Sequence, residues 1–277
     1  MKRSWLLFFI FFFSFQYSFA QQNNASDSGR VVNPSDSGYL VSFDSTKIYY
    51  EVYGNGFPVL LVHGFIANSQ SWKRTALFDS LLASGRKVIL VDMRGNGKSD
   101  KPHNDEAYIN DAETKDLMLL ITKLGINQYD VVGYSRGSII TSRLMVWDKR
   151  IRRGVLGGMG IEFTNPEWPR RIQFYHALIS DTVPELHEMV QYIQQAGLDQ
   201  QALALLQKYQ PSTSILVLKT IKIPVLVIHG DLDNDNGSAD QLALVFPYSE
   251  KAVVPGMHNQ ALQTPEFAQA VLSFLSK

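Results

Sequence analysis

The chain contains no cysteine among its 277 residues. This absence excludes disulfide bonds, thiol nucleophiles, thiolate metal sites and a lipid attached through cysteine. A surplus of charge is also missing, because 26 basic residues balance 26 acidic ones. Nothing in this balance predicts binding to nucleic acid or to an anionic membrane surface. The default partner is therefore a small neutral molecule.

A long apolar run is missing too. The longest run, Trp5 to Phe15, is shorter than the roughly 20 residues that a membrane-spanning helix needs. It follows the basic pair Lys2 and Arg3 and precedes Ser18-Phe19-Ala20, whose small residues match the positions that a signal peptidase reads. Residues 1–20 are therefore predicted to be a signal peptide cleaved after Ala20, and an uncleaved anchor is the alternative. The mature chain is expected in the periplasm or outside a bacterial cell, without a membrane span.

The remaining residues divide into a polar linker at 21–37 and one domain at 38–277. In the domain, apolar runs typical of strands alternate with amphipathic patterns typical of helices. The strands are expected at 38–43, 46–53, 58–62, 87–92, 130–134, 154–158, 222–229 and 251–254, and helices at 68–84, 110–124, 135–148 and 265–275. This alternation predicts an α/β fold with a mostly parallel sheet and helices on both faces. Ligands bind such sheets at the carboxyl ends of the strands.

One stretch combines strand, turn and helix signals around a serine. Gly133-Tyr134-Ser135-Arg136-Gly137 follows a short apolar strand and opens a helical pattern. In such a turn, Gly133 and Gly137 allow strand and helix to approach closely while the serine hydroxyl is exposed. The free N–H groups at the start of the helix favour negative charge beside that hydroxyl. Ser135 is thus a candidate nucleophile, and a glycine-rich turn without catalytic function is the alternative.

His63-Gly64-Phe65 ends the buried strand at 58–62. The turn can direct the backbone N–H of Phe65 toward Ser135, and with the N–H of Arg136 this would form a two-donor oxyanion hole. The His63 side chain itself is predicted to be structural, with its ring bonded to the loop backbone.

Three motifs in this order resemble the α/β-hydrolase superfamily: His-Gly-Phe, Met-Arg-Gly-Asn-Gly-Lys-Ser-Asp at 93–100, and Gly-Tyr-Ser-Arg-Gly. The resemblance covers about residues 38–277, with Asn96 where many relatives carry histidine. It implies a serine hydrolase, most simply a carboxylic ester hydrolase, with a Ser-Asp-His chain order and no metal or organic cofactor. Gly97-Lys98-Ser99 does not complete a phosphate-binding loop, because Asp92 replaces the required glycine.

The family order identifies the acid and the base. His258 is the one histidine that follows the loop containing Asp231, Asp233 and Asp235. The resemblance implies Asp233 as the triad acid, and Asp231 remains the main alternative. Asp231 follows Gly230 directly and is expected to hydrogen-bond the turn, whereas Asn236-Gly237 should carry Asp235 outward. The loop lacks the glycine and glutamate that a calcium-binding loop needs, so no metal is predicted.

Residues 160–220 interrupt the strand alternation with three helical patterns, at 172–179, 184–195 and 200–209. By the resemblance they form a lid, in which Trp168, Phe174 and Tyr175 are candidates for contacting a substrate. The lid contains no motif that indicates the substrate, and the sequence does not predict the oligomeric state. A non-catalytic binding or sensor protein, a peptidase, a C–C bond hydrolase and a haloperoxidase-like enzyme remain alternatives on the same fold.

Overall fold

The computed structural model describes residues 33–180 and 182–277. The predicted signal peptide and most of the predicted linker lie outside the described residues. The first strand begins at Asp36, two residues before the predicted domain boundary, and the Ser35 backbone N–H already pairs with the carbonyl oxygen of Val52.

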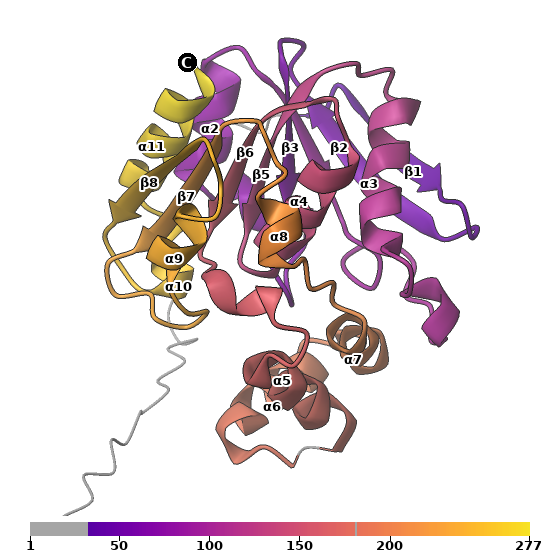
Figure 1. Cartoon of the computed structure of the whole chain (residues 1–277). Helices are drawn as coiled ribbons and strands as arrows, with labels where there is room; N and C mark the ends of the chain where they lie inside the picture. Colours follow the sequence, from indigo (N-terminus) through magenta and orange to yellow (C-terminus); the bar gives the residue numbers. More distant parts are fainter. Residues whose placement is uncertain (1–32, 181) are drawn as a thin grey trace, which may run out of the picture.

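An eight-stranded sheet forms the centre of the fold, in the order β1-β2-β4-β3-β5-β6-β7-β8 (Figure 1). Its strands are β1 (Asp36–Val41), β2 (Lys47–Tyr53), β3 (Pro58–Val62), β4 (Lys87–Val91), β5 (Tyr129–Tyr134), β6 (Ile151–Gly157), β7 (Val225–Gly230) and β8 (Ser249–Val254). The hairpin strand β2 is antiparallel to both β1 and β4, and the other neighbouring pairs are parallel. The mostly parallel α/β sheet predicted from the sequence is confirmed.

Helices cover both faces of this sheet because its central strands are apolar on both sides. The helices are α1 (Ser69–Lys73), α2 (Ala76–Ala83), α3 (Ala112–Lys123), α4 (Arg136–Trp147), α5 (Pro169–Ser180), α6 (His187–Gln195), α7 (Gln200–Lys208), α8 (Ile215–Leu218), α9 (Ala239–Ala243), α10 (His258–Ala261) and α11 (Pro265–Leu275), with single 3₁₀ turns at Asp105–Ala107, Ile161–Thr164 and Pro184–Leu186. The apolar cluster on one face contains Leu60 and residues of α3, α4, α8 and α9, and the cluster on the other face contains Leu61 and residues of α1, α2 and α11. Both leucines are fully buried, so each core is sealed by its own helical layer.

The single helix predicted over 68–84 is divided in two. Thr75 lies between α1 and α2, donates its hydroxyl to the carbonyl oxygen of Trp72 and accepts the N–H of Phe78. A threonine that caps a new helix in this way competes with a continuous helix. The short helices α8, α9 and α10 were not predicted, because four or five residues are too few for a periodic pattern.

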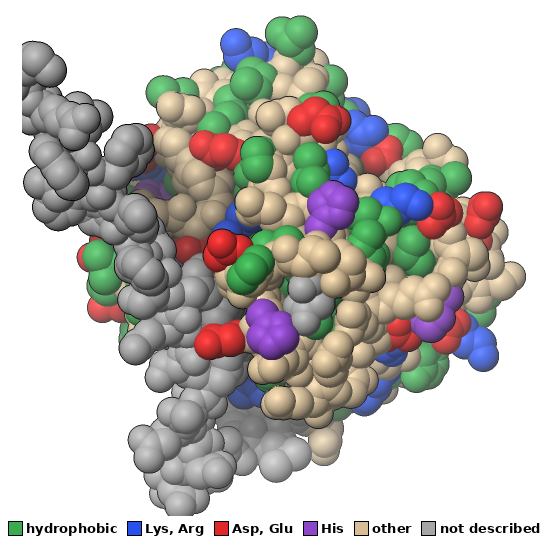
Figure 2. Space-filling model, turned by 90° about the horizontal axis from the view of Figure 1, so that it is seen from below, with side chains coloured by type: hydrophobic (Ala, Val, Ile, Leu, Met, Phe, Trp, Pro, Cys, Tyr) green, Lys and Arg blue, Asp and Glu red, His purple; other side chains and the backbone are tan. Residues whose placement is uncertain are grey.

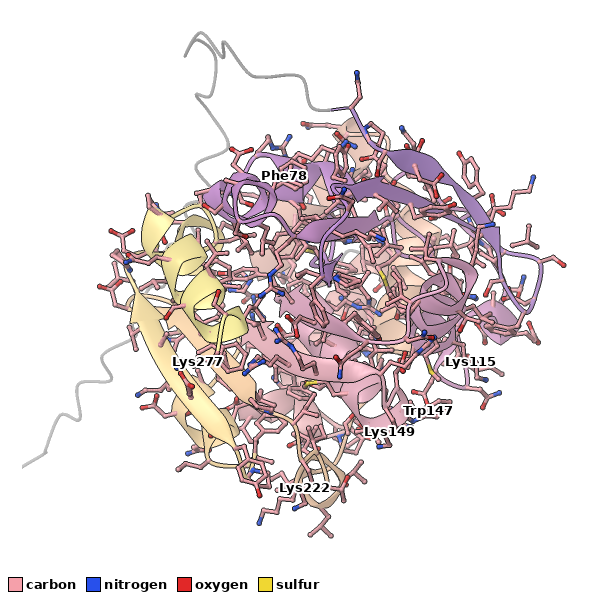
Figure 3. All side chains as sticks on the ribbon, turned by 90° about the horizontal axis from the view of Figure 1, so that it is seen from above. Phe78, Lys115, Trp147, Lys149, Lys222 and Lys277 are labelled. Carbon is pink, nitrogen blue, oxygen red and sulfur yellow. The ribbon has the colours of Figure 1, made fainter. Side chains whose placement is uncertain are left out.

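The insertion between β6 and β7 forms a separate small layer. Its helices α5, α6 and α7 enclose their own apolar cluster, which includes Val190, Ile193 and Leu206. In Figure 1 this layer lies below the sheet, and Figure 3 views the opposite end, where Lys149 and Lys222 precede β6 and β7. The predicted lid thus lies over the carboxyl ends of the parallel strands. Within the described residues, none of the helices has the length and apolar character required to cross a membrane.

Candidate active site

Ser135 occupies a strained turn between β5 and α4. Its φ of 55° and ψ of −127° lie in a region that residues with a side chain rarely adopt. A Cβ added to Gly137 would lie 2.2 Å from the carbonyl oxygen of Val62, and one added to Gly133 would lie 2.5 Å from the carbonyl oxygen of Gly137. Only glycine allows this approach of strand and helix. The predicted turn at Gly133–Gly137, called the nucleophile elbow below, therefore has a steric basis at both glycines.

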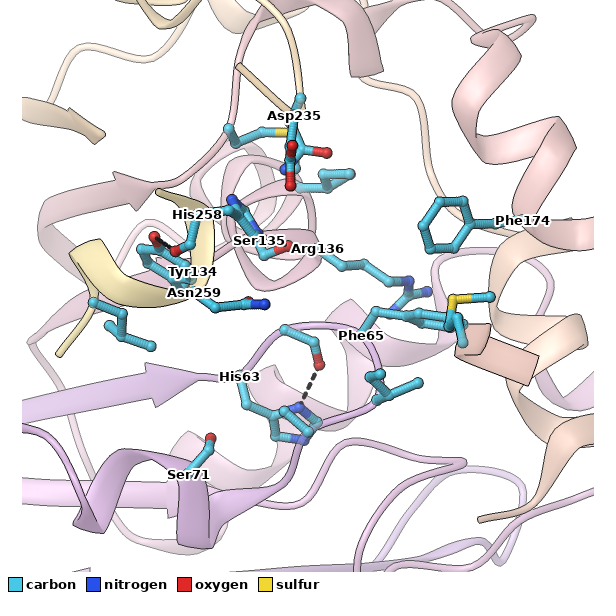
Figure 4. Close-up of a pocket in the computed structure, with 18 of the residues that line it drawn as sticks. His63, Phe65, Ser71, Tyr134, Ser135, Arg136, Phe174, Asp235, His258 and Asn259 are labelled. Carbon is cyan, nitrogen blue, oxygen red and sulfur yellow. Dashed lines mark hydrogen bonds between the residues drawn. The ribbon is translucent and has the colours of Figure 1, made fainter. Parts of the chain in front are cut away.

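A chain of two hydrogen bonds starts at the Ser135 hydroxyl, and Figure 4 shows Ser135 beside His258. Ser135 Oγ lies 2.9 Å from His258 Nε2, and His258 Nδ1 lies 2.9 Å from Asp233 Oδ2. A neutral imidazole has one donor and one acceptor nitrogen. Because a carboxylate only accepts, Nδ1 carries the hydrogen, and Nε2 is free to accept the serine proton.

The loops that follow β7 and β8 hold the acid and the base. The backbone N–H of Asp235 donates to Asp233 Oδ1 at 3.2 Å, and the hydroxyl of Tyr134 donates to the backbone carbonyl of His258. Burial by itself would raise the pKa of the Asp233 carboxyl, but the hydrogen bond and charge of His258 and the Asp235 N–H hold that pKa below its ordinary value. Asp233 is therefore ionised at neutral pH.

The other two aspartates of the loop have different partners. Asp231 Oδ1 accepts the backbone N–H of Gly256 at 2.7 Å and thereby links the two loops, in agreement with its expected role in the turn. Asp235 is exposed, and its carboxylate lies 3.9 Å from Arg170 Nη2 in the lid. Of the three, Asp233 is the one bonded to the His258 ring.

His63 is a structural residue, as predicted. Its Nε2 accepts the N–H of Met93 at 3.0 Å, so the hydrogen is on Nδ1, which donates to the Gly64 carbonyl at 2.8 Å. Burial lowers the pKa of the His63 imidazole, which favours this neutral form. The turn lies against the nucleophile, because a Cβ added to Gly64 would be 3.2 Å from Ser135 Cβ.

Phe65 and Arg136, the two predicted oxyanion donors, flank the nucleophile. Both line the same cavity as Ser135, and Arg136 is the first residue of α4, whose N–H has no partner within the helix. The Arg136 side chain has a separate role that the sequence did not reveal. Its guanidinium makes two 2.7 Å bonds to the Glu113 carboxylate and one of 2.9 Å to the Leu206 carbonyl in the lid. The ion pair connects α4 to α3, and the bond to Leu206 connects α4 to α7.

A cavity of about 1040 Å³ opens beside Ser135 and His258 and is closed on one side by the lid. Trp168 and Phe174 line it as predicted, and Phe174 packs edge-on against Phe65 with ring centroids 5.8 Å apart. Tyr175, the third aromatic residue expected to contact a substrate, does not line this cavity. Its ring packs against the apolar cluster of the lid. On α5, Tyr175 is rotated by about 100° from Phe174, so the two rings point in different directions.

The sequence reading missed polar residues of the lid that also line the cavity, namely Arg170, Arg171, Gln207 and Gln210. Arg170 and Phe174 are four residues apart on α5 and therefore share a helix face, a spacing that could have indicated them. Figure 2 views the lid end of the molecule, where charged side chains of both signs are interspersed.

Asp233, Asp235 and His258 place possible metal-binding atoms within 4.8 Å of one another. Asp233 and His258 are already bonded to each other in the chain that leads to Ser135. The geometry thus accounts for these two side chains without an ion.

Comparison with known proteins agrees with this architecture. The model of the alpha/beta hydrolase fold family matches residues 58–159. A bromoperoxidase from Bacillus anthracis superposes with a TM-score of 0.73 and 25% identity, covering 87% of this chain and 100% of that one. An esterase from Exiguobacterium antarcticum superposes with a TM-score of 0.74 and 20% identity, covering 87% of this chain and 100% of that one. The chain therefore has the α/β-hydrolase fold, and residues 58–159 match the family of that name.

Curated relatives match over a shorter segment. A 2-hydroxymuconate semialdehyde hydrolase from Pseudomonas sp. (strain CF600) is 36% identical over 112 residues, which are 40% of this chain and 39% of that protein. The bifunctional epoxide hydrolase 2 of Sus scrofa is 28% identical over 116 residues, 42% of this chain and 20% of that protein. The matched segments thus span two fifths or less of these two relatives. Enzymes of several activities share this fold, and small-molecule substrates are typical of the family.

Proposed function

We propose that this protein is a serine hydrolase that cleaves an ester or a related acyl bond through an acyl-enzyme intermediate. The observation that carries the proposal is the hydrogen-bonded chain from Ser135 through His258 to Asp233. These three residue types in this order form a nucleophile, a base and a group that orients the base.

In the proposed reaction, His258 Nε2 removes the hydroxyl proton while Ser135 Oγ attacks the carbonyl carbon of the substrate. Asp233 stabilises the imidazolium, and the N–H groups of Phe65 and Arg136 donate to the oxyanion of the tetrahedral intermediate. The imidazolium then gives its proton to the leaving alcohol. Water, activated by the same histidine, releases the acid and restores the serine. These steps use no metal and no organic cofactor.

A series of p-nitrophenyl esters with acyl chains of increasing length tests this proposal on the purified protein. Ser135→Ala should lower kcat by on the order of 10³-fold or more without unfolding the chain. A fluorophosphonate probe should label the wild type and leave Ser135→Ala unlabelled. Equal labelling of both proteins would show that Ser135 is not the nucleophile.

C–C bond hydrolysis is the second candidate function. The observation that supports it is the 36% identity to a protein named 2-hydroxymuconate semialdehyde hydrolase. Assaying 2-hydroxymuconate semialdehyde beside the p-nitrophenyl esters separates the two. A kcat/KM that is higher for the semialdehyde than for every ester would replace the ester proposal. Absence of turnover on either substrate, with intact folding, would favour a binding protein.

We also propose that the protein is exported to the periplasm or the medium. The support is the basic start at Lys2 and Arg3, the short apolar run and Ser18-Phe19-Ala20. Mass spectrometry of protein recovered from the native envelope or medium should find Gln21 as its first residue. A full-length chain recovered from the cytoplasm would refute export.

A further inference from the structure

The cavity beside Ser135 has an excess of positive charge that the whole chain does not have. Among the described residues that line it, Arg74, Arg136, Arg170 and Arg171 are basic, and Asp235 alone is acidic. The complete sequence, by contrast, has equal numbers of basic and acidic residues. A cavity lined by one sign of charge raises the local concentration of ligands of the opposite sign.

Two of these arginines are already engaged in holding the structure. Arg136 is neutralised by the buried carboxylate of Glu113, with which it forms two bonds of 2.7 Å. Arg171 donates to the backbone carbonyls of Pro166, Gln207 and Lys208, and so joins the two ends of the lid. Neither guanidinium is available to a ligand without a loss of these contacts.

The other two arginines are available. Arg170 lies over the ring of Phe174, 5.0 Å from its centroid, and its nearest carboxylate, that of Asp235, is 3.9 Å away. The tight arginine–carboxylate pairs elsewhere in the described chain are 2.7 to 2.9 Å long, so the contact with Asp235 is loose. Arg74 directly follows α1, lines the same cavity, is exposed and has no carboxylate within ion-pair distance among the described residues.

Of these two cations, Arg170 lies near the catalytic residues. Asp235 is next to the triad, since a carboxylate oxygen of Asp235 lies within 4.8 Å of a carboxylate oxygen of Asp233 and of a ring nitrogen of His258. Arg170 therefore lies just beyond the triad on the lid side, and its position over Phe174 places it beside an apolar wall. An acyl chain against Phe174 would bring a terminal carboxylate to this guanidinium, where an arginine can bind it with two hydrogen bonds.

Building on the proposed acyl hydrolase activity, we propose that the natural substrate carries a carboxylate remote from the bond that is cleaved, and that Arg170, assisted by Arg74, binds this group. This anionic substrate replaces the small neutral ligand that overall composition suggests. The arginines are binding residues that select the substrate, and the bond-breaking steps remain those of Ser135 and His258.

The test compares two matched esters, the mono-p-nitrophenyl ester of adipic acid and p-nitrophenyl hexanoate, which share a six-carbon acyl chain and a leaving group. The ratio of their kcat/KM values should fall roughly tenfold or more in Arg170→Gln, mainly through KM of the anionic ester, because a charged hydrogen bond is lost. Arg74→Gln should reduce the ratio in the same direction. Lys219→Gln, which removes an exposed charge away from the cavity, is the control and should leave the ratio unchanged.

A carboxylate on the leaving group is tested with the acetyl ester of 4-hydroxybenzoate against p-tolyl acetate. Intrinsic reactivity cancels, because each ratio is compared between variant and wild type. Unchanged ratios for both pairs in Arg170→Gln and Arg74→Gln, with melting temperatures near that of the wild type, would overturn the inference while leaving ester hydrolysis intact.

A binding measurement separates this inference from the proposed activity. Adipate should raise the melting temperature of Ser135→Ala, and the shift should disappear when Arg170→Gln is added. If the wild type hydrolyses none of the esters, the proposed function is refuted. If adipate raises the melting temperature of Ser135→Ala equally with and without Arg170→Gln, the anion site is refuted.

Discussion

Replacing Asp233 with asparagine should lower kcat by about 10⁴-fold at neutral pH, although the two side chains have nearly the same shape. The orientation of the new amide follows from two neighbours. The Asp235 N–H, now 3.2 Å from Asp233 Oδ1, requires an acceptor, so the amide oxygen stays on that side. The amide NH₂ then faces His258 Nδ1, at the position where Asp233 Oδ2 now lies at 2.9 Å.

This orientation reverses the histidine tautomer. A donor opposite Nδ1 requires Nδ1 to be the acceptor, so the ring hydrogen moves to Nε2. Nε2–H then faces Ser135 Oγ at 2.9 Å as a donor and cannot remove the hydroxyl proton. The equivalent substitution in a well-studied Ser-His-Asp enzyme costs about 10⁴ in kcat, or roughly 5 kcal/mol in activation free energy.

Steady-state turnover of a p-nitrophenyl ester, measured together with melting temperature, tests the prediction. The matched control is Asp231→Asn, which removes the same charge from the same loop but keeps an oxygen for the Gly256 N–H that Asp231 now binds at 2.7 Å. The control should keep most of its activity. Near wild-type turnover in Asp233→Asn, together with loss of turnover in a folded Asp231→Asn, would refute the reasoning and identify Asp231 as the acid.

Three further substitutions test the packing and electrostatics around the site. Glu113→Gln leaves the buried Arg136 guanidinium without its counter-charge and should cost about 3–5 kcal/mol in urea unfolding; an unchanged midpoint would contradict a buried pair. Burial raises the pKa of the Asp148 carboxyl, but hydrogen bonds from Arg150 and Tyr129 outweigh burial and hold that pKa below its ordinary value. The free energy of unfolding of the wild type should therefore exceed that of Asp148→Asn above about pH 4, and this difference should disappear as the pH falls through the lowered pKa of Asp148 in the folded protein. A difference that does not change with pH would contradict this prediction. Gly137→Ala would place a Cβ 2.2 Å from the Val62 carbonyl and should lower the melting temperature and abolish fluorophosphonate labelling, whereas full labelling would show that the elbow can relax.

Much of the architecture was predictable because local signals determine it. The unbroken apolar strands and the amphipathic segments between them predicted the parallel sheet, since a strand buried on both faces must be apolar at every position. The elbow was predictable for a similar reason, because Gly133 and Gly137 are the residues that the close approach of strand and helix requires. Chain order within the resembled family then left His258 as the one histidine in the position of the base.

Contacts between distant segments could not be predicted in this way. Nothing near Glu113 indicates that it pairs with Arg136, because that bond depends on how α3 packs against α4. Local pattern likewise named Phe174 and Tyr175 together, whereas the docking of the lid helices decides which ring faces the cavity.

The sequence by itself determined the fold class, the serine turn and the loops that supply the acid and the base, because these depend on periodicity, on glycine and on chain order. The tertiary structure alone decided which carboxylate meets the base. Asp231, Asp233 and Asp235 are chemically identical and lie within five residues. Packing of the β7 loop against the β8 loop gives Asp231 the Gly256 N–H and leaves Asp233 directed at His258. A difference of direction between identical side chains arises only when the two loops meet, and no single stretch of the sequence contains it.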